Sequence, residues 1–253
     1  MRYFVKGDSI VRKIWGKSDT ILFIFAGASA EFALNKAVDW LYFTGKLPAD
    51  PIGRLFSTVA YARQIVFAEF GDALEAIDKI TQIHSAVEKS RGKNIPDWAY
   101  RDVLFMLIDY SIRAFEVLER DLSRKEKEEV FDVFYRVGEQ MGIANLPLTY
   151  NDWLVQRKAH MEENLQLSSF SKDLYLQYKR HLGFLRFHLL KQAQKLVTPK
   201  RVNQLLNLGR VPILLPVIFL YKLCRVVKLE QLLKDAILPG EYKVQIANLD
   251  IRS

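Results

Sequence analysis

One histidine, His84, is expected to point into an apolar interior, where it could be a metal ligand or a buried hydrogen-bonding group. His84 lies in the stretch from Asp72 to Ser90, which has helical periodicity and ends just before Gly92. The residues that share its face are all apolar: Ala73, Ile77, Ile80 and Val87. An imidazole that points into an apolar interior needs a backbone carbonyl, a carboxylate or a metal as its partner. Taken alone, these residues favour a hydrogen-bonded core histidine over a metal ligand.

A second group of polar residues lies on the preceding predicted helix. Arg54 and Thr58 are four residues apart and share one face, which Tyr61 and Ile65 continue. The neighbouring stripe is wholly apolar and consists of Leu55, Val59, Ala62 and Val66. An arginine and a hydroxyl beside such a stripe can bind the carboxylate of a buried ligand. An arginine that extends from the start of a helix into solvent is an equally acceptable interpretation.

Residue spacing excludes several common catalytic sites. No histidine has a carboxylate three residues before it, so the Glu-x-x-His pairs of di-iron bundles are absent, as is the His-Glu-x-x-His of zinc proteases. The segment Gly27-Ala28-Ser29-Ala30 lacks the second glycine of a nucleophile elbow. The single cysteine, Cys224, excludes an internal disulfide and a thiolate cluster, and it indicates a reducing compartment.

Helix-capping residues recur along the whole chain, and the connections between the expected helices are short. Asp50-Pro51, Ser123 with Glu126, and Thr149 with Asp152 are typical helix starts. The predicted helices run from Ser18 to Gly45, Asp50 to Phe70, Asp72 to Ser90, Asp97 to Arg120, Ser123 to Gly142, Thr149 onward, Ser169 to Leu196 and Thr198 to Gly209. Alternation with a period of two is confined to Tyr242–Ile251, which predicts a strand or an extended tail.

These elements predict an all-α fold, with a globin-like helical core and additional helices in a single domain. We expect residues 1–210 to form the main helical domain. Residues 211–253 are expected to form a C-terminal helical appendage and tail packed on the same domain, because Pro212 and Pro216 interrupt the chain there.

The apolar stretches do not resemble membrane spans. Ile21 to Phe43, the most apolar of them, contains Glu31, Lys36 and Asp39, which a bilayer interior would penalise. The first seventeen residues carry charges throughout, unlike a secretory signal. We therefore expect a soluble, cytoplasmic protein, with a peripheral membrane contact left open.

The net charge of +8 is concentrated in the last third of the sequence. Between Lys172 and Asp235 there are thirteen Lys and Arg against three Asp and Glu. A basic region rich in aromatic residues can face acidic lipid headgroups or nucleic acid. A solvated helix face is the favoured interpretation. We expect no nucleic-acid partner, and residues 172–234 remain a candidate for membrane contact.

The run Asp50-Pro51-Ile52-Gly53-Arg54-Leu55-Phe56-Ser57-Thr58, followed by Ile83-His84, resembles the mpaB-like and rubber oxygenase (latex clearing protein) family. In that pattern an Asp-Pro-x-x-Arg-Leu-x-x-Thr helix precedes a helix that carries one histidine. Ser9–Gly16 resembles the opening segment of the family, and Leu214-Leu215-Pro216 resembles its C-terminal turn. The resemblance extends from about Ser9 to Leu229.

This resemblance implies haem b inside the helical core, with its iron bound by His84. It implies that Arg54 and Thr58 lie beside the haem, where Arg54 would pair with a propionate. We also expect Tyr61 and Ile80, on the same two faces, to contact the cofactor. Family members use molecular oxygen to cleave carbon–carbon double bonds of isoprenoids. The resemblance thus implies a haem-dependent oxygenase for an apolar isoprenoid or lipid substrate, with Arg54 and Thr58 as catalytic residues.

One position departs from the family. Some rubber oxygenases have a lysine before the threonine that reaches the distal face of the iron, whereas this chain has Ser57, whose side chain is too short. The sixth iron site and the general base therefore stay open, with Glu69 as a candidate base. The remaining histidines, His160, His181 and His188, are candidate distal ligands, and for His181 and His188, seven residues apart on a basic helix, a surface position is favoured.

Two other functions compatible with the sequence remain. One is a non-catalytic haem sensor or carrier, in which protein ligands fill both axial positions. The other is a helical protein without a cofactor that binds acidic membranes or a partner through residues 172–234. Substrate identity and oligomeric state are left open.

Overall fold

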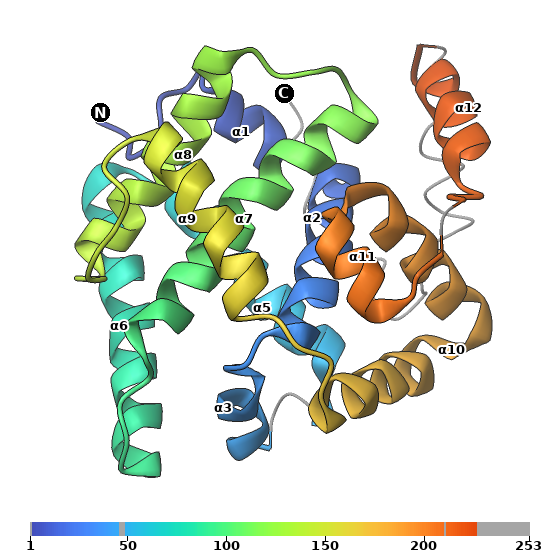
Figure 1. The fold of residues 1–253 in the computed structure, drawn as a ribbon. Coiled ribbons are helices and arrows are strands. Elements are labelled where there is room, and N and C mark those ends of the chain that lie inside the picture. The colour runs from blue at the N-terminus through green and yellow to red at the C-terminus, as the bar shows by residue number, and fades with distance from the viewer. Residues whose placement is uncertain (1, 46–48, 210, 227–253) are drawn as a thin grey trace.

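The computed structural model describes residues 2–45, 49–209 and 211–226. These residues form a single all-α domain, as predicted, with two isolated bridges and no strand in the described ranges (Figure 1). The helices are α1 (Ile10–Trp15), α2 (Ser18–Leu34), α3 (Val38–Phe43), α5 (Pro51–Phe67), α6 (Phe70–Arg91), α7 (Asp97–Leu118), α8 (Arg124–Gln140), α9 (Tyr150–Glu163), α10 (Ser169–Val197), α11 (Lys200–Leu206) and α12 (Leu215–Val226).

Helix α2 lies at the centre of the domain, with α7 and α10 packed against it. Its close contact with α7 depends on Gly27, since a Cβ there would lie 2.1 Å from Cδ1 of Tyr110. Ile21 and Ile24 of α2 are buried in the main hydrophobic cluster. The fold therefore holds the middle of α2 against a largely apolar interior, where any charged group needs a compensating partner.

Helices α5 and α6 are neighbours joined by the short segment Ala68–Glu69. The backbone N–H of Phe70 donates to the carbonyl of Arg2 at 2.8 Å, so the N-terminal segment is fixed against this connection. Ala73 and Ile77 in the first half of α6 are fully buried, whereas the second half of the helix is less covered. His84 consequently lies at the edge of the core.

Several predicted helix starts are confirmed by their hydrogen bonds. The Asp50 carboxylate accepts from the backbone N–H of Gly53 at 2.8 Å. Ser123 and Glu126 form the predicted capping box, and Thr149 Oγ1 accepts from the N–H of Asp152. These side chains satisfy backbone donors that the first helical turn leaves unpaired.

The prediction of one helix from Ser18 to Gly45 is wrong. The chain leaves the helix at Asn35, whose side-chain oxygen accepts from the N–H of Ala37 at 2.8 Å and whose backbone bridges to Leu165. A separate helix, α3, follows. The long helix from Ser169 is also not straight, because Gly183 has φ 71° and ψ 177° inside α10. Helix α6 begins at Phe70, two residues before the predicted Asp72.

The C-terminal region is described only in part. Helix α12 belongs to the predicted appendage 211–253, and the division at residue 210 stays a prediction. The predicted strand or tail at Tyr242–Ile251 lies outside the described residues. In the part of the chain that is described, no helix combines the length and apolarity needed to cross a membrane.

Candidate functional site

His84 lies on α6, with its imidazole partly buried and packed edge-on against the ring of Tyr100 at a centroid distance of 5.2 Å. Its Nδ1 atom is buried and has no hydrogen-bond partner among the described residues. A buried polar atom without a partner is costly, and in native proteins it calls for an explanation. A ligand bound to this imidazole would explain the unpartnered nitrogen.

Tyr100 is itself held in place by Glu88. The Oε1 atom of Glu88 accepts from the Tyr100 hydroxyl at 3.1 Å and from the backbone N–H of Ile95 at 2.8 Å. These bonds join the end of α6 to the start of α7. Burial and the neighbouring carboxylate of Glu88 raise the pKa of Tyr100, which therefore remains a protonated donor. The aromatic contact to His84 thus has a fixed geometry.

The guanidinium of Arg54 on α5 lies close enough to His84 to affect its protonation. Burial lowers the pKa of His84 below its ordinary value, the positive charge of Arg54 lowers it further, and Glu88 opposes the shift. The imidazole is therefore neutral at neutral pH. A neutral imidazole has a free nitrogen lone pair and can ligate a metal without first losing a proton.

Arg54 retains hydrogen-bond donors for an anionic ligand. One Nη1–H reaches Ser57 Oγ at 3.4 Å, and within the described residues Arg54 has no carboxylate partner. The hydroxyls of Ser57 and Thr58 both donate to the Arg54 carbonyl, at 2.8 and 3.2 Å. A planar guanidinium with free N–H groups is suited to binding a carboxylate through two bonds.

The structure places the remaining predicted residues on the same two helices. Thr58 is exposed, Tyr61 is partly buried, and Ile80 is partly buried one turn before His84. Val59, Ala62 and Val66 of the predicted apolar stripe are buried, and the side chain of Leu55 lies outside what the structure describes. His84 and Arg54 are brought together. Direct contact of Thr58, Tyr61 and Ile80 with a cofactor stays a prediction.

Arg91 ties the far end of α6 to α3. Its guanidinium donates to Asp39 at 2.7 Å and lies over the rings of Trp40 and Phe43, at 4.0 and 5.3 Å from their centroids. An arginine that combines an ion pair with two aromatic contacts is well fixed. The second half of α6, which carries His84, is therefore supported by α3, α5 and α7.

The donor set at His84 limits the kind of metal group that it could hold. In the described ranges no group of three or more His, Cys, Asp or Glu side chains is arranged to bind a metal ion. A metal at His84 would take its other ligands from a cofactor, as haem iron does from its macrocycle. The single neutral histidine with an arginine alongside fits such a group.

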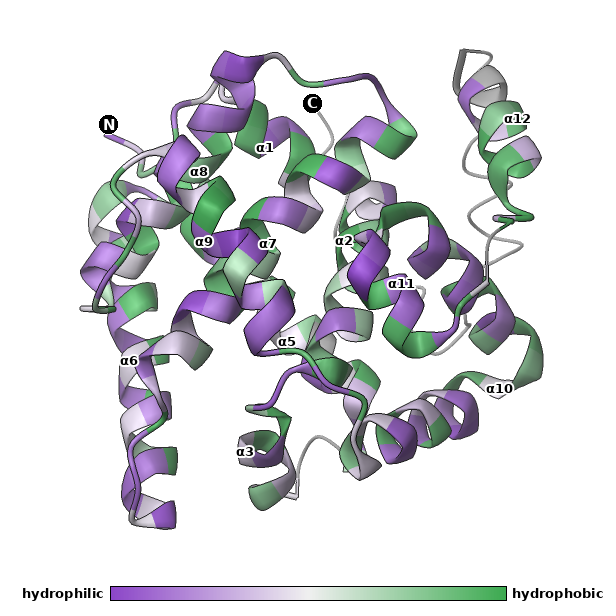
Figure 2. Ribbon diagram, in the orientation of Figure 1, coloured by the Kyte–Doolittle hydropathy of each residue, from purple (hydrophilic) through white to green (hydrophobic). Residues whose placement is uncertain are grey.

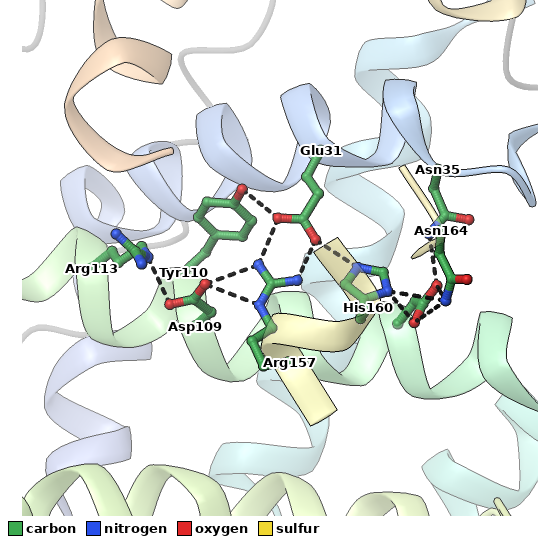
Figure 3. A network of polar contacts seen from close by, with 9 residues as sticks. Glu31, Asn35, Asp109, Tyr110, Arg113, Arg157, His160 and Asn164 are labelled. Carbon is green, nitrogen blue, oxygen red and sulfur yellow. Dashed lines mark hydrogen bonds and ion pairs between the residues drawn. The ribbon is translucent and has the colours of Figure 1, made fainter. Parts of the chain in front are cut away.

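His160, one of the candidate distal ligands, has another role. Its Nε2 contacts Glu31 Oε1 at 3.0 Å and its Nδ1 contacts a carboxylate oxygen of Asp102 (Figure 3). Both ring nitrogens are occupied, so the expectation that His160 could ligate iron is not supported. His181 and His188 are exposed on α10, as predicted.

A buried network of charges around Glu31 was not predicted. The guanidinium of Arg157 binds both carboxylate oxygens of Glu31, with an Nη2–Oε2 distance of 2.6 Å, and its Nη2 reaches Asp109 at 2.9 Å. The Tyr110 hydroxyl donates to Glu31 Oε2 at 2.7 Å (Figure 3). The sequence signal was Glu31 itself, a carboxylate inside an apolar helix, which demands a buried cation.

Electrostatics favour the charged forms of Glu31 and His160. Burial alone would raise the pKa of Glu31, but Arg157 and His160 hold it well below the usual range. Burial alone would lower the pKa of His160, but hydrogen bonds to Asp102 and Glu31 raise it. The network joins α2, α7 and α9, and we interpret it as structural because its polar groups bond one another.

A cavity of about 320 Å³ adjoins this network, and it is distinct from the His84 site. Its lining includes Asp102, His160 and Asn164 of the network, together with Trp98 and Arg101. The Asp102 carboxylate also accepts from Asn164 Nδ2 at 2.9 Å. The charged side chains in its lining make this cavity unsuited to an apolar substrate.

Comparison with known proteins gives one result for the chain as a whole. The sequence profile described as ER-bound oxygenase mpaB/B'/rubber oxygenase, catalytic domain, matches residues 14–227. That range includes α5, α6 and the complete His84–Arg54 arrangement. A search of curated proteins found no match.

Proposed function

The chain belongs to the mpaB/rubber oxygenase family, whose catalytic domain spans residues 14–227, and on this premise we propose that it is a haem b-dependent oxygenase in which His84 would hold the iron. Family membership supports oxygenase activity. The observation that carries the cofactor assignment is the neutral imidazole of His84, which has an unpartnered buried nitrogen and lies beside the guanidinium of Arg54.

Each residue of the site has a stated role in this proposal. His84 would hold the iron, and Tyr100 would keep the imidazole in one orientation by its edge-on contact. Arg54 would bind a propionate through its free N–H groups. Thr58 would donate its hydroxyl to the cofactor edge or to a bound polar atom, in place of its bond to the Arg54 carbonyl.

Haem supplies, when bound, the electronic chemistry that activates molecular oxygen. The protein would contribute apolar surroundings for the reacting double bond. Exclusion of water protects such a reaction from side products.

We propose an unsaturated isoprenoid or another unsaturated lipid as substrate. Cleavage of one carbon–carbon double bond by one molecule of oxygen gives two carbonyl groups, and both oxygen atoms are retained in the products. The net reaction is balanced without an additional reductant.

The test uses the full chain expressed with added haem precursor. An absorption spectrum of the ferrous protein, with and without carbon monoxide, reports whether haem binds and whether the sixth position is open. The protein is then incubated with squalene under oxygen or nitrogen, and carbonyl products are sought by mass spectrometry after hydrazone formation. Oxygen-dependent carbonyl products support the proposal. Failure of the protein to bind haem would contradict the cofactor assignment. A haem protein that neither binds carbon monoxide nor forms products would favour a carrier or sensor.

A further inference from the structure

Helix α12 contacts the domain through Tyr221, Lys222 and the buried Ile218, and it exposes four apolar side chains. The Tyr221 hydroxyl donates to Asp19 Oδ2 at 2.7 Å, and Lys222 Nζ donates to the carbonyl of Glu119 at 3.4 Å. The exposed apolar side chains are Leu215, Val217, Phe219 and Leu220. A surface helix of a globular domain normally turns polar side chains outward. Among residues 2–45, 49–209 and 211–226, these four apolar side chains of α12 are left uncovered.

A second exposed apolar group lies at the bend of α10. Gly183 has φ 71°, a conformation that residues with a Cβ rarely adopt, and the chain changes direction there. Phe184 and Leu185 follow directly and are 79% and 69% exposed. Two large apolar side chains next to each other at a convex bend are costly in water unless another surface covers them.

Two hydrogen bonds hold the segment before α12 against the second half of α10. The N–H of Ile213 donates to Gln192 Oε1 at 3.1 Å, and Lys195 Nζ donates to the carbonyl of Val211 at 3.4 Å. The segment that leads into α12 thus lies along the second half of α10, and its Val211 and Ile213 are exposed. Figure 2 shows green, hydrophobic positions at the bend of α10 and on α12 on the same side of the view.

We call this surface the α10–α12 face, and it consists of Phe184, Leu185, Val211, Ile213, Leu215, Val217, Phe219 and Leu220. Its charge is as distinctive as its apolarity. Residues 174–229 contain eleven Lys and Arg and no Asp or Glu. Lys179, Arg180 and Arg186 flank the bend of α10 and are exposed. The face therefore combines apolar side chains with flanking positive charges.

We propose that the α10–α12 face binds the surface of a lipid bilayer that contains anionic lipids. A bilayer interface offers an apolar layer for Phe184 and Phe219 and negative headgroups for the surrounding cations. A nucleic acid would bind the cations but would leave the aliphatic side chains in water. An acidic protein surface would have to match apolar groups spread over two helices. This inference is independent of the proposed oxygenase function, because vesicle binding does not need haem.

The test is flotation of the full chain with vesicles of phosphatidylcholine alone or of phosphatidylcholine with phosphatidylserine. We expect at least about tenfold stronger binding to the anionic vesicles, and weaker binding at high salt because charges are screened. The variant Phe184→Ser/Leu185→Ser should reduce binding about tenfold, since it removes two apolar side chains that the membrane would bury. Lys179→Glu/Arg180→Glu should remove the preference for anionic vesicles.

The matched control is Leu148→Ser/Val155→Ser, because these two apolar residues are equally exposed, at 77% and 71%, but lie outside the α10–α12 face. This control should bind vesicles like the wild type. All variants replace exposed side chains, and their melting temperatures verify folding. Absence of binding to anionic vesicles would overturn the proposal. Equal loss in the control pair, or self-association or RNA binding through the face without vesicle binding, would also overturn it.

Discussion

The positive charge of Arg54 on α5 disfavours protonation of His84 on the neighbouring helix α6. Burial lowers the pKa of the His84 imidazole and the charge of Arg54 lowers it further, so the histidine stays neutral and able to bind a metal. The same arrangement favours an anion beside the arginine. A group that carries both a metal ion and carboxylates satisfies both requirements, and haem b is such a group.

The first prediction concerns the protonation of His84 in the protein without haem. Replacing Arg54 with glutamine removes a positive charge that disfavours the imidazolium, so Arg54→Gln should raise the pKa of His84. The measurement is an NMR titration of the His84 ring protons. Glu88→Gln is the opposite control, because loss of that negative charge should lower the pKa further. If both variants shift the pKa in the same direction, the electrostatic account of the site is wrong.

The second prediction concerns His160 and the pH dependence of stability. Its folded-state pKa is raised, so the folded protein holds this proton more tightly than the unfolded chain does. The stabilisation is complete below an unfolded-state pKa of about 6.5. It is lost as pH rises through the folded-state value. Urea unfolding across this range should show a smaller decline with pH for His160→Gln than for the wild type, and an unchanged slope would contradict the assignment.

The third prediction concerns the buried pair of Glu31 and Arg157. Glu31→Gln removes one of the two carboxylates that bind Arg157, and Arg157→Met removes the cation that binds both oxygens of Glu31, so each should lower the free energy of unfolding by about 3–5 kcal/mol. The double variant should lose clearly less than the sum of the two, because it removes both charges together. Denaturant unfolding of the four proteins measures this coupling. Strict additivity would mean that the two side chains do not interact as the structure indicates.

The fourth prediction concerns the bend of α10. Gly183 has a positive φ and open space where a Cβ would lie, so Gly183→Ala should destabilise the protein by backbone strain alone, by about 1 kcal/mol. Gly71 in α6 also has open space but no positive φ. Gly71→Ala should therefore be neutral or slightly stabilising. Thermal unfolding of both variants tests this, and equal effects would argue against the strained bend.

Helix ends could be predicted wherever a side chain caps the backbone locally. Asp50, Ser123 and Thr149 are examples, since each accepts a hydrogen bond from the backbone N–H three residues further along the chain. The break at Asn35 could not be predicted in this way, because it depends on a bridge to Leu165 far along the sequence. Contacts between residues that are distant in sequence cannot in general be predicted from a periodic pattern.

The polar residues of the protein likewise include some that the sequence could predict and some that it could not. His84 and Arg54 were identified from helical spacing and family resemblance, and the structure brings them together. The partners of Glu31 were not identified, because Arg157 and His160 are more than a hundred residues away in sequence. His160 was consequently considered as a free ligand. Its role follows only from the packing of α9 against α7, which brings His160 to Asp102.

The most direct test of the central claim is the haem content of His84→Ala beside that of the wild type. The control is His181→Ala, which removes an exposed histidine on α10. Each protein is expressed with haem precursor, and the ratio of haem to protein is measured by the pyridine haemochrome assay. The account predicts stoichiometric haem in the wild type and in His181→Ala, and loss of most haem in a folded His84→Ala. Normal haem content in His84→Ala would contradict it.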